Sequence, residues 1–294
     1  MIVAALALVG AAAAAAPGTA DYTAPSVSID LARPTVDGRA GVVVEDARAV
    51  DGLAASVLVG HAHLPLVWQP DGAETIAIVR GATSAWMTAA WGRGPVRIGV
   101  ALPAYLVVTS DLESPRGTGL GDASIDLKLS LPRSGERVVG GALLSRVIAP
   151  TGDAAMQVGA TGWSAEAGAA ADAQAGRWGA GLNLVARLSP ATDLGGVTVG
   201  GGGAWRAAGS FRLSEPVHLQ AELFGQQVWS ELMRFSAPSA AELLVGVRAR
   251  LPSGALLRGG AGAGLGGAPG APLWRLVVGV GHPAALAAPT LASE

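Results

Sequence analysis

Polar and apolar side chains alternate along most of this chain, in segments of about ten residues. The clearest is 121–131, where Asp122, Asp126 and Lys128 share one face, and alanine, isoleucine and leucine occupy the other. Successive residues of a strand point to opposite sides, whereas a helix would scatter these charges around its circumference. The segments match the ~9–11 residues that a tilted membrane strand needs. The pattern therefore predicts strands with one polar and one apolar face.

Clusters of Pro, Gly, Asp and Ser divide the chain into twelve such strands. An even number of strands is typical of single-chain bacterial barrels. It places the start of the first strand and the end of the last strand on the same side of the membrane. We predict an all-β fold, a transmembrane antiparallel β-barrel of about 12 strands over residues 53–281. The predicted strands are 53–67, 74–91, 95–108, 119–131, 137–149, 160–171, 176–188, 194–206, 216–229, 240–251, 255–265 and 271–281.

The predicted connections are consistent with this topology. If the chain enters from the periplasm, the turns 92–94, 132–136, 172–175, 207–215 and 252–254 face the periplasm. All three ten-residue connections, 109–118, 150–159 and 230–239, then lie outside. Outer-membrane barrels have short periplasmic turns and longer external loops.

The composition excludes several classes of function. A net charge of −2 provides no basic surface for nucleic acid. The absence of Cys removes disulfide frameworks and thiolate metal sites. Gly, at 43 of 294 residues, is too abundant for a helical protein, because each Gly inside a helix costs roughly 1 kcal/mol relative to Ala.

The N-terminal region has the features of an export signal. Residues 1–16 are uncharged and apolar, and small residues allow cleavage after Ala16 or Ala20. The alternative, a transmembrane anchor, needs ~20 strongly apolar residues. We therefore expect a signal peptide over 1–20, an N-terminal periplasmic segment over 21–52 and a C-terminal tail over 282–294.

Eight tryptophans fall near the ends of predicted strands. Indole rings are favoured at the headgroup level of a membrane, so this placement predicts two aromatic girdles. The alternative is that they are core aromatics of a soluble β-sandwich. The predicted girdle residues are Trp68, Trp86, Trp91, Trp163, Trp178, Trp205, Trp229 and Trp274.

The polar strand faces predict a charged lumen. If that lumen is open, its excess of basic residues would favour small anionic solutes. If it is closed, the same residues would form internal ion pairs that brace the barrel. Arg80 and Arg146 do not fit, because the alternation places both outward. The predicted lumen-lining residues are Arg97, Asp122, Asp126, Lys128, Glu166, Arg177, Asn183, Arg187, Glu222, Glu242, Arg248, Arg250, Arg258 and Arg275.

Candidate catalytic groups are sparse, and we expect no enzyme, no cofactor and no metal site. His61 and His63 share a strand face without a nearby acidic residue in the sequence, which leaves a metal pair as the lesser alternative. Asn183 could orient a histidine in a barrel hydrolase, but it alternates with arginines and should face the lumen, away from lipid. The glycine runs 200–203 and 259–267 lack the strand-loop-helix context of phosphate loops.

Several motifs resemble one known family. The stretch 28–72, Gly119-Leu-Gly-Asp122, Ala149-Pro-Thr-Gly-Asp153 and Pro272-Leu-Trp-Arg275 look like the N-terminal barrel region of OmpA-family outer-membrane proteins. The resemblance implies an outer-membrane barrel. The family's peptidoglycan-binding segment has no match here, so peptidoglycan binding is not expected.

These observations together predict an outer-membrane β-barrel protein in contact with outer-membrane lipid. Its role would be that of a small passive, porin-like channel or of a structural envelope protein. The alternative is a secreted soluble β-sandwich or lipid-binding module.

Overall fold

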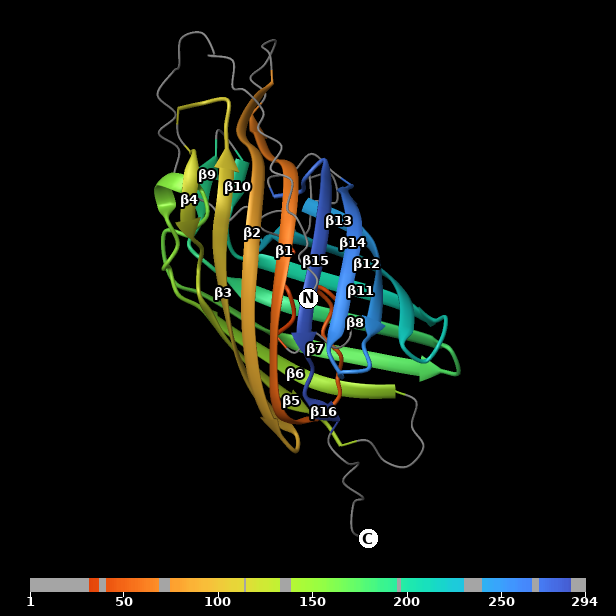
Figure 1. Cartoon of the computed structure of the whole chain (residues 1–294). Coiled ribbons are helices and arrows are strands. Elements are labelled where there is room, and N and C mark those ends of the chain that lie inside the picture. Colours follow the sequence, from red (N-terminus) through yellow and green to blue (C-terminus); the bar gives the residue numbers. More distant parts are fainter. Residues whose placement is uncertain are drawn as a thin grey trace.

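The computed structural model describes residues 32–36, 41–68, 75–113, 115–132, 139–194, 197–229, 240–265 and 270–286. Within these residues, twelve antiparallel strands form one closed barrel (Figure 1). The strands are β1 (Val50–Trp68), β2 (Ile76–Arg93), β3 (Val96–Thr109), β5 (Ser124–Ser130), β6 (Val139–Ile148), β7 (Ser164–Ala175), β8 (Trp178–Leu188), β11 (Gly202–Arg212), β12 (Val217–Val228), β13 (Ala240–Arg250), β14 (Leu256–Gly264) and β15 (Trp274–His282).

Each barrel strand pairs with the next along the chain, and the last strand closes the ring against the first. β15 pairs with β1 over nine positions, from Ala55↔His282 to His63↔Trp274. Closure leaves no free sheet edge, so the backbone polar groups are satisfied within the sheet, as a span through hydrocarbon requires. The predicted fold is confirmed.

Short and long connections lie at opposite ends of the barrel. The turns 94–95, 176–177, 213–216 and 251–255 are at one end, which we call the short-turn end. The β3–β5 and β6–β7 connections, 110–123 and 149–163, are at the other, the long-loop end. The second of these carries the 3₁₀ turn η1 (Ala154–Met156). After β15, the short strand β16 (Ala285–Leu286) pairs with Val50 and Asp51.

The predicted strand 160–171 is shifted toward the C-terminus as β7, and two other predicted strands differ more from the structure. The predicted strand 119–131 divides into β4 (Gly117–Leu120) and β5, because Asp122 turns away from the ladder to bind loop backbone, as described below. The predicted strand 194–206 is displaced to β11, so the predicted turn 207–215 is too long. In its place, β9 (Thr192–Leu194) and β10 (Val197–Val199) pair as a separate hairpin.

The outer face of the barrel is apolar and exposed. Ile125, Leu184 and Val278 are 61%, 57% and 62% exposed, and outward Leu, Val and Ile residues recur on strands around the ring. A soluble sandwich would bury such residues between two sheets, whereas here a single sheet closes on itself. The sandwich alternative is therefore not the fold of this chain. None of the described residues forms a helix long and apolar enough to cross a membrane.

The interior is filled in part by the chain that precedes β1. We call residues 32–36 and 41–49 the inner segment; it lies within the barrel (Figure 1). Val36, Val42 and Val44 are completely or almost completely buried. The prediction placed 21–52 in the periplasm, but the described part of that range lies inside the barrel or, from Val50, in β1. The predicted signal peptide, 1–20, lies outside the described residues.

Candidate functional site

The inward faces of the strands carry a buried polar cluster. Inward and outward positions alternate in exposure along β5, β7 and β15, as the alternation of the sequence requires. Ten of the fourteen predicted lumen residues are buried: Arg97, Asp122, Asp126, Lys128, Glu166, Asn183, Glu222, Glu242, Arg258 and Arg275.

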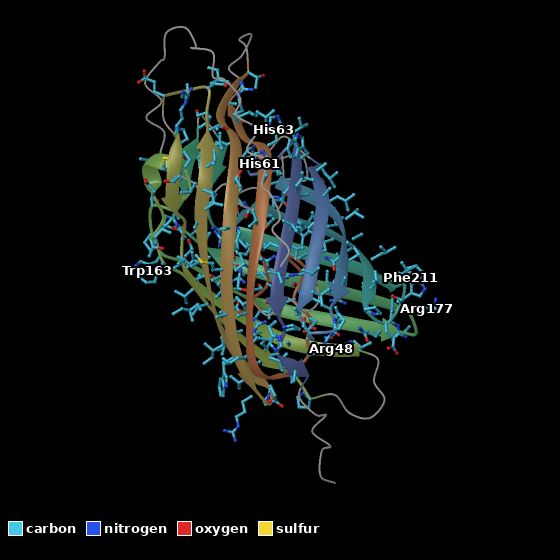
Figure 2. All side chains as sticks on the ribbon, viewed as in Figure 1. Arg48, His61, His63, Trp163, Arg177 and Phe211 are labelled. Carbon is cyan, nitrogen blue, oxygen red and sulfur yellow. The ribbon has the colours of Figure 1, made fainter. Side chains whose placement is uncertain are left out.

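The other four predicted lumen residues are more exposed. Arg187 and Arg248 are half-buried, and Arg250 is exposed at the end of β13. Arg177 is an exposed residue of the β7–β8 turn, at the short-turn end beside Phe211 (Figure 2). Arg177 was predicted to face the lumen as part of a strand. The predicted turn 172–175 lies at 176–177 in the structure, so Arg177 belongs to the turn and not to β8.

Glu222 on β12 holds the inner segment by its backbone. Its carboxylate accepts hydrogen bonds from the backbone N–H groups of Val42, Val43 and Val44, at 2.7, 2.8 and 3.0 Å. The side chain of Gln220 donates to the same carboxylate at 3.1 Å. Hydrogen bonds to an ionised acceptor are roughly twice as strong as neutral ones. These hydrogen bonds compensate for the burial of the Glu222 carboxylate. They also fix the inner segment to the barrel wall.

Asn183 on β8 holds the next residue of the inner segment. The Glu45 N–H donates to Asn183 Oδ1 at 2.8 Å, and Asn183 Nδ2 donates to the Glu45 carbonyl at 2.9 Å. The single asparagine of the chain thus binds backbone.

The side chain of Glu45 begins an ionic network that runs around the lumen. Arg97 donates to Glu45 at 2.8 Å and also pairs with Asp126. Arg146 pairs with Asp126 at 3.1 Å and with Glu166 at 3.9 Å. Charges removed from bulk water are tolerated only when paired and hydrogen-bonded. The network therefore requires the inner segment to complete it.

Further ion pairs connect the inner segment to the wall. Lys128 Nζ lies 3.2 Å from Asp46 Oδ1, and Arg48 lies 3.5 Å from Asp172. Arg33 lies 3.7 Å from Glu166.

Small residues on the wall make room for the inner segment. A Cβ added to Gly99 on β3 would lie 2.6 Å from Val36 Cγ2, and one added to Gly181 on β8 would lie 3.2 Å from Val44 Cγ1. A Cβ added to Gly41 would lie 2.6 Å from the Glu222 carboxyl carbon. Part of the glycine content is thus explained by packing inside the barrel, where close approach leaves no space for a side chain.

Sequence reasoning missed several residues of this site. Arg146 was predicted to point outward, but the register of β6 places it opposite Asp126 and Glu166 on the inner face. Arg206 on β11, also inward, lies 3.5 Å from Glu166. The alternation of β11 could have indicated Arg206 if its boundaries had been correct. Arg80, the other exception, is exposed and pairs with Asp111.

The tryptophans divide between the two faces. Trp91, Trp163, Trp178, Trp229 and Trp274 are exposed, and Trp163 projects from the barrel in Figure 2. Trp205 is half-buried with its ring over Gly225. Trp86 is 6% exposed and packs inside with the inner segment, so it is not a girdle residue. Trp86 lies on the inward face of β2. The girdle prediction considered only its position near a strand end and not the strand face on which it lies. The side chain of Trp68 lies outside the described residues.

A cavity of about 450 Å³ opens at the short-turn end of the lumen. Residues 44–46 and Arg48 of the inner segment line its inner side. Deeper in the lumen, three cavities around Arg33 and Glu166 hold only about 10–20 Å³ each. The inner segment thus separates this cavity from the long-loop end.

The long-loop end is narrowed by a folded loop. Asp122 accepts hydrogen bonds from the N–H groups of Gly152 and Ala160, at 3.0 and 2.8 Å, and so closes the base of the β6–β7 connection. Met156 and Val158 of that loop pack with a buried apolar cluster that includes Tyr105.

The two neighbouring histidines of β1 lie on the outer face. His61 and His63 both contact the Trp274 ring, with ring centroids 5.2 Å apart in each case. The His61 ring nitrogen is also 2.8 Å from the Thr83 hydroxyl. No group of three or more metal-ligating side chains occurs among the residues described.

Comparisons with known proteins find similar structures but no similar sequences. No family model and no curated protein matches the sequence, so the resemblance to OmpA-family barrels has no support from them. An outer membrane channel from Pseudomonas putida F1 has a similar structure, with a TM-score of 0.61 and 15% identity over 79% of this chain and 95% of that one. The NanC porin matches over 79% of this chain and 100% of that one, with a TM-score of 0.48 and 10% identity. At 15% identity, the likeness to the Pseudomonas putida channel supports the barrel fold alone.

Proposed function

We propose that this protein is an outer-membrane channel that its own N-terminal inner segment narrows. The observation that carries the proposal is the position of residues 41–48, which cross the lumen between a wide cavity and a region of small voids. A barrel with an exposed apolar band belongs in a membrane. The fold shared with the Pseudomonas putida channel supports the outer membrane as its location.

The inner segment is held by contacts that can be replaced by water. Its anchors are hydrogen bonds and ion pairs with Glu222, Asn183, Arg97 and Lys128. Each of these wall groups could be hydrated in an open lumen, at a net cost of about 0.5–1.5 kcal/mol per neutral hydrogen bond and about 1.5–3 kcal/mol per hydrogen bond to a charged group. The barrel strands, by contrast, pair with one another independently of the segment. A closed and an open lumen are therefore both compatible with an intact barrel.

The second candidate is a structural envelope protein without transport. The continuous ionic network through Arg97, Asp126, Arg146 and Glu166 favours it, because such a network braces the barrel wall. Under either role we propose no catalytic activity, no cofactor and no binding of peptidoglycan.

Conductance of the purified protein in planar bilayers tests the proposal. We expect the full-length protein to conduct weakly, and a variant lacking residues 32–47 to conduct several-fold more. Folding of both is checked by migration on unheated against boiled SDS gels. A folded deletion variant that still fails to conduct at high salt would exclude the channel and favour the structural role.

A further inference from the structure

Arginines outnumber carboxylates at one place in the lumen, where β7, β8 and β11 meet the inner segment. The register places Arg187 on β8 directly opposite Glu166 on β7. The Glu166 carboxylate, however, pairs with three other arginines: Arg206 at 3.5 Å, Arg33 at 3.7 Å and Arg146 at 3.9 Å. One carboxylate therefore lies among four arginines.

Arg187 is left without a carboxylate partner. It forms no ion pair with any carboxylate in the part of the chain that the structure describes, and its Nη1 donates to Gln226 Oε1 at 3.3 Å. Although the residue as a whole is half-buried, its Nε is buried and has no hydrogen-bond partner among the described residues. Asp122, the other acidic residue that acts on Arg187, already binds the N–H groups of Gly152 and Ala160. Such an arrangement is costly, because charges inside a protein are tolerated only when they are paired.

A void of about 20 Å³ lies against these arginines. Its charged lining residues are Arg33, Arg187 and Arg206, with Glu166 as the single carboxylate, and its other lining residues are Ala204, Phe224, Gly225 and Gln226. Ala204 lies two positions before Arg206 and therefore on the same face of β11, where its short side chain leaves space. A water molecule needs ~10–15 Å³ measured in this way. The void therefore has room for one atom or molecule of about the size of water, and not for a phosphate.

A water molecule in this void would leave the charge of Arg187 uncompensated. Water can accept a hydrogen bond from Nε, but it carries no charge. Phe224, which is 2% exposed, closes one side of the void with an apolar ring. Repulsion among like charges is stronger in such surroundings than in water, because the local dielectric constant is lower. A monoatomic anion would supply both the acceptor and the missing negative charge.

We propose that this void binds a chloride ion, held by Arg187 Nε and by the guanidinium of Arg206. Chloride is only slightly larger than water and accepts N–H donors from any direction. Arg33 belongs to the inner segment, whereas Arg187 and Arg206 belong to the wall, so the ion lies where the segment and the wall meet. The site exists in the closed barrel and does not depend on whether the lumen conducts.

Crystals of the full-length protein soaked in sodium bromide test the site, because bromide replaces chloride and is located by its anomalous scattering. We expect an anomalous peak in the void, in contact with Arg187 Nε. Arg187→Gln should abolish the peak, because it removes the uncompensated charge. The matched control Arg177→Gln changes an exposed arginine of the β7–β8 turn and should retain the peak. A void without anomalous density, or a peak that persists in Arg187→Gln, would overturn the proposal.

Thermal unfolding in detergent micelles gives an independent measurement in solution. Chloride is exchanged for isethionate, an anion too large for the void, at constant ionic strength. We expect chloride at ten times its dissociation constant to raise the Tm of the unmodified protein by about 3–5 °C and to leave the Tm of Arg187→Gln unchanged. In isethionate, Arg187→Gln should be at least as stable as the unmodified protein, so the variant is expected to fold.

Equal responses of Arg187→Gln and the unmodified protein to chloride would exclude the site. Conductance is measured separately, so the two proposals can fail independently. A barrel that binds chloride without conducting would retain this site and exclude the channel. A conducting barrel whose Tm does not respond to chloride would exclude this site and leave the channel proposal intact.

Discussion

Asn183 and Glu45 are joined as two paired strands would be, with the side-chain amide of one residue hydrogen-bonded to both backbone polar groups of the other. A side chain of the barrel wall thereby provides hydrogen-bond partners for the backbone of a segment that crosses the lumen without belonging to a sheet. Buried backbone groups require such partners. This pair explains how an irregular segment can remain inside the barrel, and it predicts where that segment can be released.

Replacement of Asn183 by Ala should release the inner segment. It leaves a buried N–H and a buried carbonyl of Glu45 without their partners, at about 1–3 kcal/mol for each group. We expect trypsin to cleave after Arg48, which Ala49 follows, faster than in the unmodified protein, as measured by mass spectrometry. Gln174→Ala, an equivalent truncation of an exposed residue on β7, should leave cleavage unchanged. Equal protection of the Asn183 variant would contradict this anchoring role.

A methyl group at Gly99 should displace the inner segment by direct contact. Its Cβ would lie 2.6 Å from Val36 Cγ2, closer than side chains can approach. We expect Gly99→Ala to increase trypsin cleavage, and the double variant Gly99→Ala/Val36→Ala to restore protection because it removes the opposing methyl groups. Gly209→Ala is the control, since no atom lies within 4 Å of an added Cβ there. Failure of the double variant to restore protection would argue against this contact.

Two arginines with acidic partners should differ in their contributions to stability. Arg97 is buried between Glu45 and Asp126, so Arg97→Met leaves two buried carboxylates and should lower the free energy of unfolding by about 3–5 kcal/mol. The side chain of Arg80 is 54% exposed beside Asp111, so Arg80→Met should cost at most about 1 kcal/mol. Guanidinium unfolding of both variants in lipid vesicles gives the comparison. Similar losses would mean that the lumen network is not a stabilising element.

Trp86 and Trp91 should report opposite sides of the same strand. Trp91 is 47% exposed on the outer face, whereas Trp86 is 6% exposed and packs inside. In vesicles of brominated lipid, we expect Trp91→Phe to remove part of the fluorescence quenching and Trp86→Phe to leave the quenching intact. Trp86→Ala should also destabilise the protein by about 3–5 kcal/mol, the usual cost of a large buried cavity. Strong quenching that depends on Trp86 would place its ring toward lipid and contradict the structure.

The period-two pattern predicted the barrel because strand pairing is local. Each strand pairs mainly with the next along the chain, so alternation and turn residues are sufficient to give the number of strands and most of their inward-facing residues. The same reasoning placed Lys128, Glu222 and Arg258 inside, where they are buried. It was wrong for Arg146, which the register of β6 places inside. It was also wrong for Arg177 and for the strand that became β11, because strand ends follow turn and hairpin geometry that the pattern does not contain.

The sequence by itself determined a twelve-stranded barrel with charges on the inner face and apolar residues on the outer face. Only the tertiary structure decided what those inner charges contact. Glu222 binds Val42 across 180 positions of sequence, and Asn183 binds Glu45 across 138. Contacts of this kind have no period in the sequence, since they form only after closure of the barrel brings distant strands around one lumen. The position of the inner segment within the lumen is therefore a property of the closed ring.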